Sequence, residues 1–104
     1  MSHAKVDARS LAMHRAIAEK LRANPALIEI ARENLERWSS EPGRSGRYWE
    51  AWREILARPL PEVLELIVED SERMTAMRQT SPFAGVLDPR ERWAIYDEFA
   101  AERK

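Results

Sequence analysis

The sequence contains no cysteine, three glycines and two histidines among its 104 residues. Without cysteine the chain has no disulfide, no thiolate nucleophile and no Cys-ligated zinc site. The two histidines form no His-x3-His pair and lie in no obvious carboxylate cluster, so we expect no metal site and no cofactor. Gly43 and Gly46 sit between helices rather than between a strand and a helix, which argues against a phosphate-binding glycine loop. No glycine-flanked nucleophile turn supports a Ser/His/Asp arrangement.

Long apolar runs and a strong net charge are also lacking. No run reaches the roughly 18–20 apolar residues that a membrane-spanning helix needs, so we expect no membrane partner. The formal net charge of −1 argues against the broad basic surface of a sequence-independent nucleic-acid binder. No targeting segment is recognisable at the N-terminus, so the expected compartment is the cytoplasm.

Helical periodicity is what the sequence does contain, and no stretch shows sustained β-branched alternation. With 44% hydrophobic residues, the chain is apolar enough to fold as a single domain over residues 1–104. We predict an all-α fold, a compact bundle of about five amphipathic helices, with a flexible tail at 1–6 and a flexible connector at 39–46. The predicted helices cover residues 7–23, 25–38, 45–57, 60–79 and 88–99, and the fourth, with its wide apolar arc, is expected to be central.

The fourth predicted helix carries an acidic stripe beside its apolar arc. On a regular helix its glutamates fall within about 80° of one another: Glu62, Glu65, Glu69 and Glu72. A solvated helix face explains such a stripe, and the functional alternative is docking onto a basic cleft of a protein that handles nucleic acid.

The loop at 81–87 is apolar where polar residues are expected. Phe83, Val86 and Leu87 must be covered either by the chain's own core or by a partner. The fifth helix is introduced by an Asp88-Pro89 start with Glu91 three positions on, and we expect it to bury Trp93. The four tryptophans of a domain this small cannot all be fully buried, so at least one is a candidate interface anchor.

Arg9 and His14 have the Arg-x4-His spacing that resembles the RNA-cleaving motif of HEPN-type helical domains. Positions five apart on a helix point about 140° away from each other, and His14 falls on the apolar face of its helix, which favours a packing role. A third hypothesis is a DNA-binding autoregulator that uses a basic face, although the near-neutral charge weakens it. Its candidate residues are Arg32, Arg37, Arg44 and Arg47.

Four segments carry a resemblance to a known family: 9–21, 30–38, 69–73 and 81–93, of which Ser-Pro-Phe-Ala-Gly-Val-Leu at 81–87 is the most distinctive. The chain resembles the small helical bacterial antitoxins that accompany nucleotidyltransferase-like toxins of the abortive-infection type. The resemblance implies a non-enzymatic function, in which the antitoxin covers or distorts the toxin's substrate cleft by direct contact. It supplies no catalytic residues to carry over.

The expected function is therefore that of an antitoxin-like binding module with a toxin as its protein partner, and self-association through the fourth helix and the tryptophans is an alternative. The acidic stripe would complement a basic cleft, and the apolar loop would anchor the complex. The candidate partner-binding residues are Glu62, Glu65, Glu69, Glu72, Phe83, Val86 and Leu87.

Overall fold

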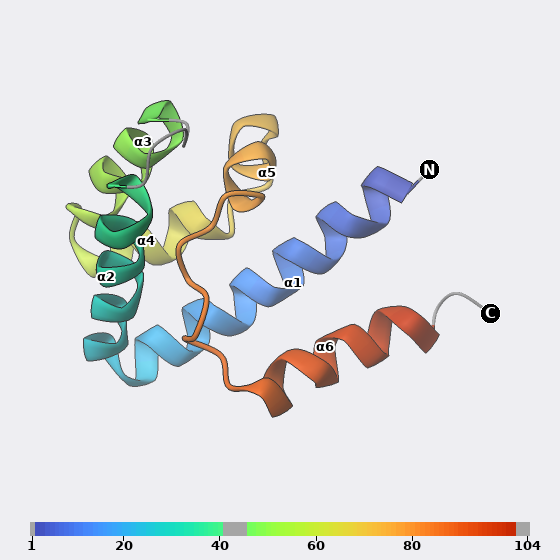
Figure 1. The fold of residues 1–104 in the computed structure, drawn as a ribbon. Helices are drawn as coiled ribbons and strands as arrows, with labels where there is room; N and C mark the ends of the chain where they lie inside the picture. Colours follow the sequence, from blue (N-terminus) through green and yellow to red (C-terminus); the bar gives the residue numbers. More distant parts are fainter. Residues whose placement is uncertain (1, 41–45, 102–104) are drawn as a thin grey trace.

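The computed structural model describes residues 2–40 and 46–101, and over these ranges the protein is all-α, as predicted (Figure 1). Helix α1 begins at Ser2, so residues 2–6 of the predicted flexible tail are helical. Of the predicted connector at 39–46, residues 41–45 lie outside the described residues. The elements in chain order are α1 (Ser2–Ala23), the 3-10 turn η1 (Pro25–Leu27), α2 (Ile28–Ser39), α3 (Gly46–Leu56), α4 (Leu60–Ile67), α5 (Glu72–Arg78) and α6 (Pro89–Ala101).

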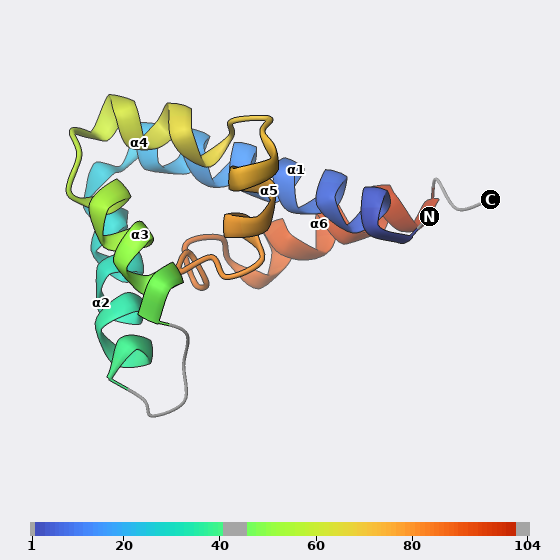
Figure 2. The ribbon, with the colours of Figure 1, turned by 90° about the horizontal axis from the view of Figure 1, so that it is seen from above.

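The central element is α1, which packs against α4, α5 and α6, while α2 packs against α3. Figures 1 and 2 show α1 and α6 side by side and antiparallel, projecting beyond the other helices, with the α2/α3 pair at the opposite end. The start of α1 and the end of α6 therefore lie at the same end of the molecule. None of the described helices combines the length and apolar character that crossing a membrane requires.

The prediction of one continuous central helix at 60–79 is wrong, because the chain leaves the helical conformation between Ile67 and Glu72. Ser71 is extended, and its hydroxyl accepts the amide N–H of Met74 at 3.2 Å, which is the geometry of a helix N-cap. The Arg78 guanidinium donates to the carbonyl oxygens of Ile67 at 3.1 Å and Glu69 at 2.9 Å, so it satisfies acceptors that the end of α4 leaves free.

This break removes the geometric basis of the acidic stripe. Glu62 and Glu65 are on α4, Glu69 lies in the connection and Glu72 begins α5. All four side chains are exposed, as a charged surface requires, but they do not share one helix face.

Trp52 is at the centre of the core, fully buried and in edge-to-face contact with Phe83 at 5.7 Å between ring centroids. The expectation that the fifth helix buries Trp93 is wrong, since that side chain is 63% exposed. Helix α6 packs on α1, and Ile95, which points about 160° away from Trp93 on a regular helix, is the residue of α6 that this contact buries.

The segment that connects α5 to α6 covers the chain's own core, with Pro82, Phe83, Val86 and Leu87 all buried. A buried segment without regular structure needs partners for its backbone polar groups. The side-chain amide of Asn34 on α2 supplies two of them, donating to the carbonyl oxygens of Pro82 at 2.9 Å and Ala84 at 2.8 Å. We refer to residues 79–88 as the core loop.

Two further side chains hold the core loop in place. The indole N–H of Trp52 on α3 donates to the Thr80 hydroxyl at 3.2 Å, and His14 on α1 bonds Ser81 at 2.8 Å. Gly85 has φ +97°, a left-handed conformation that side chains rarely adopt, and it lets the backbone turn beside Ile30. Helices α1, α2 and α3 thus each contribute one side chain that forms a hydrogen bond with the loop.

Replacing Asn34 with Ala should lower the free energy of unfolding by about 2–4 kcal/mol, because two loop carbonyls lose their donor in a buried site. Urea unfolding followed by circular dichroism measures the change. Glu33→Ala, an exposed position on the same helix, is the matched control and should stay within about 0.5 kcal/mol of the original protein. Equal stability of the two variants would contradict the role of Asn34.

Candidate functional site

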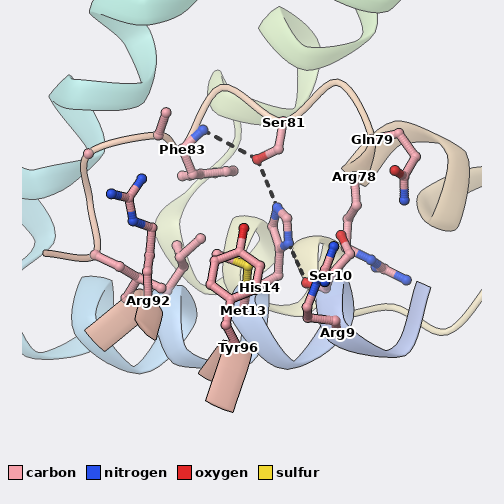
Figure 3. Close-up of a pocket in the computed structure, with 14 residues that line it drawn as sticks. Arg9, Ser10, Met13, His14, Arg78, Gln79, Ser81, Phe83, Arg92 and Tyr96 are labelled. Carbon is pink, nitrogen blue, oxygen red and sulfur yellow. Dashed lines mark hydrogen bonds between the residues drawn. The ribbon is translucent and has the colours of Figure 1, made fainter. Parts of the chain in front are cut away.

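A pocket of about 290 Å³ lies where α1, the core loop and α6 meet (Figure 3). Its polar lining includes His14 and Ser81, which the fold brings together from positions 67 residues apart in the chain. Its apolar lining comes from α1 and the loop: Met13, Ile17, Phe83, Ala84, Gly85 and Leu87.

His14 is buried, with both ring nitrogens in hydrogen bonds. Nδ1 lies 2.7 Å from the carbonyl oxygen of Ser10, and Nε2 lies 2.8 Å from the Ser81 hydroxyl. A carbonyl oxygen can only accept, so Nδ1 carries the proton and donates to Ser10, while Nε2 accepts the Ser81 hydroxyl proton. The hydrogen-bond network therefore assigns one neutral tautomer to His14.

The electrostatic surroundings keep His14 neutral at physiological pH. Burial lowers the pKa of the imidazole to about 4, because the charged form loses its hydration. The hydrogen bond to Ser10 opposes this shift, and the positive charge of Arg78 adds to it. The imidazole is thus an acceptor for Ser81 and carries no charge near pH 7.

The Ser81–His14 pair has the hydrogen bond of a serine nucleophile and its base, an arrangement that the sequence did not indicate. A general base acts best when its pKa is near the working pH, and a pKa of about 4 makes His14 a weak one. The Ser81 hydroxyl also accepts the amide N–H of Phe83 at 3.3 Å, closing a turn within the loop. This geometry fits attachment of the core loop to α1 better than catalysis.

Arg9 and His14 line the same pocket, although helical geometry places them on different faces of α1. The Arg9 guanidinium carbon lies 4.8 Å from the centroid of the Tyr96 ring, a cation–π contact between α1 and α6. Since both nitrogens of His14 are bonded and its side chain is 4% exposed, the structure gives no support to an RNA-cleaving Arg9/His14 pair.

The seven predicted partner-binding residues fall into two groups. Phe83, Val86 and Leu87 are only 2%, 2% and 4% exposed, so the core loop packs on its own domain and a partner could reach them only after the loop left the core. The four glutamates of the predicted stripe are exposed, although Glu62 forms an ion pair with Arg58 at 3.2 Å.

The predicted basic face is mixed in charge. Arg32 and Arg37 are exposed on α2, but Arg32 forms an ion pair with Glu29, and Arg37 donates to Asn34 at 2.6 Å. Arg47 is exposed at the start of α3, and Arg44 lies outside the described residues. The described part of this surface therefore does not favour DNA binding.

The exposed aromatic surface is on α6 instead. Trp93 and Tyr96 lie one helical turn apart, with ring centroids 5.7 Å from each other, and Arg9 packs on the Tyr96 ring. We refer to Trp93 and Tyr96 of α6, together with Arg9 of α1, as the α6 aromatic face. The aromatic content predicted an interface anchor, and the structure identifies Trp93 as the large hydrophobic side chain that stays exposed among the described residues.

The stability of the protein should fall as the pH is lowered from about 6.5 to about 4. In the unfolded chain His14 has a pKa of 6.5, whereas in the folded state its pKa is lowered to about 4. The folded state therefore loses about 3 kcal/mol of stability across this window, relative to pH 7.

Urea unfolding at a series of pH values tests this, with His14→Gln as the comparison because glutamine does not titrate. We expect the variant to be less stable near pH 7 and to converge on the original protein as the pH falls. A stability difference that stays constant between pH 7 and pH 4 would contradict a depressed pKa at His14.

Comparison with protein-family models, with curated proteins and with solved structures gives no match to this chain. The residues of the chain itself are therefore the basis for a functional assignment.

Proposed function

We propose that this chain is a non-enzymatic binding module, the antitoxin of a bacterial toxin–antitoxin pair that neutralises a nucleotidyltransferase-like toxin by direct protein contact. The observation that carries the binding function is the α6 aromatic face, in which the Trp93 side chain is 63% exposed. The toxin as partner rests on the resemblance of the four sequence segments to such antitoxins.

The α6 aromatic face has the composition of an interface hot spot. Tryptophan, tyrosine and arginine are the residue types most enriched among residues that dominate binding energy. Trp93 and Tyr96 are held by a helix, and Tyr96 is also held by Arg9, so little conformational entropy is lost when a partner covers them. This face would supply the apolar anchoring first assigned to Phe83.

The exposed glutamates would have a different part in the same complex. A toxin that acts on nucleic acid needs a basic substrate cleft, and Glu65 and Glu69 present negative charge without occupying a buried site. Exposed charges of this kind accelerate association and make it sensitive to salt, whereas a desolvated aromatic anchor slows dissociation. The two surfaces therefore predict separable kinetic effects.

Trp93→Ser should raise the dissociation constant of the toxin complex at least about thirtyfold, mainly through faster dissociation, because it deletes a central aromatic anchor. Charge reversal at Glu65 and Glu69 should instead slow association and flatten its salt dependence. Surface plasmon resonance with the protein encoded by the adjacent gene measures both rates, and rescue of growth on co-expression measures neutralisation.

Ala94→Ser, at an exposed neighbouring position on α6, is the matched control and should bind normally. Because Trp93 is mostly exposed, circular dichroism of Trp93→Ser should match that of the original protein. Absence of both complex and rescue would refute the antitoxin proposal. A normal complex with folded Trp93→Ser and with the charge-reversed variant would refute both contact surfaces.

A further inference from the structure

Three of the residues that line the pocket between α1, the core loop and α6 are arginines, and none of its lining residues is Asp or Glu. His14, the other ionisable nitrogen base there, is neutral near pH 7. The charged lining residues are therefore all positive, in a protein whose formal net charge is −1, and the carboxylate of Asp7 bonds the lining residue Gln79 from outside the lining. Such a concentration of one charge favours an anionic occupant.

The three arginines differ in whether their guanidinium groups are already bonded within the protein. Arg78 is 4% exposed and its Nη1 donates to the carbonyls of Ile67 and Glu69, so it belongs to the structure of the α4–α5 connection. Arg9 and Arg92 lie on either side of Tyr96 at the pocket (Figure 3). Within the part of the chain that the structure describes, neither of these two guanidinium groups forms an ion pair.

The floor of the pocket is apolar. Ile17, Phe83 and Leu87 are buried there, and Met13 is half-buried beside them. A fully hydrated ion such as phosphate gains nothing from such a floor, whereas an apolar chain or ring does. The volume of about 290 Å³ is near the lower end of the ~300–1,000 Å³ that small-molecule pockets usually have, so it suits a small ligand.

We propose that this pocket binds a small amphipathic carboxylate, with its hydrocarbon part on the floor and its carboxylate at Arg92. Guanidinium groups bind carboxylates through charge-assisted hydrogen bonds, and a neighbouring apolar wall strengthens them by excluding water. This small-molecule site shares the lining residues Arg9 and Tyr96 with the α6 aromatic face, but its test uses Arg92 and needs no protein partner.

Octanoate is a suitable probe, because its ten non-hydrogen atoms match the size of the pocket. Titration to 30 mM at pH 7, followed by amide chemical shifts in NMR spectra, should give saturable shifts at Phe83–Leu87 and in α6. For a ligand of this size we expect a Kd on the order of 1 mM. Octanamide, which keeps the chain and lacks the charge, and inorganic phosphate, which lacks the chain, should each bind at least about tenfold more weakly.

Arg92→Gln should raise the Kd for octanoate about tenfold, since it removes a charge-assisted contact. Arg90→Gln removes the same charge from an exposed position of α6 that does not line the pocket, and it should leave the Kd unchanged. Arg92 is not part of the α6 aromatic face, so Arg92→Gln should still bind the toxin. This separates failure of the carboxylate site from failure of the antitoxin proposal.

Three results would overturn the carboxylate site. The first is the absence of saturable shifts at the pocket with octanoate. The second is equal binding of octanoate and octanamide, which would show that the arginines do not select an anion. The third is an equal effect of Arg90→Gln and Arg92→Gln, which would reduce the interaction to general charge attraction.

Discussion

The structure depends on satisfying the backbone of one irregular segment that runs through its core. Residues 79–88 do what a helix would do in most bundles, filling the space between α1, α2 and α3 with Phe83 and its apolar neighbours. A helix satisfies its own amides and carbonyls, whereas two carbonyls of this loop depend on the amide of Asn34. Trp52 and His14 bond the side-chain hydroxyls of the loop and so attach it to two further helices. The hydrogen bonds that satisfy the polar groups of the loop therefore also hold its apolar side chains in the core.

The fold class and most helix positions could be predicted because they are set by local periodicity and caps. The Asp88/Glu91 capping box, for example, forms in both directions at 2.8 Å. The break before α5 was missed because apolar residues keep a helical spacing from Leu64 to Met74. A local signal for it was present, since Asp70-Ser71 is a typical helix start, but the decisive contact comes from Arg78.

The candidate sites depended on long-range contacts that no local pattern encodes. Asn34 did carry a signal, because it lies with Ala31 and Leu35 on the apolar side of its helix, where an amide indicates a buried hydrogen-bond partner. Its partners in the loop could not be named from spacing. Trp93 is likewise exposed because α6 packs on α1 and this contact covers the opposite side of α6. The helical pattern of a sequence identifies apolar positions, but it does not show which of them another helix covers.

The pairing of α1 with α6 also makes the fold depend on contacts between segments that lie far apart in the chain. Lys20 and Glu91, which bridge α1 and α6 at 2.5 Å, are 71 positions apart, so α1 emerges from the ribosome long before its partner exists. Contacts of such separation form late in folding. A chain cut short before α6 would lose this bridge together with Arg92, Trp93 and Tyr96.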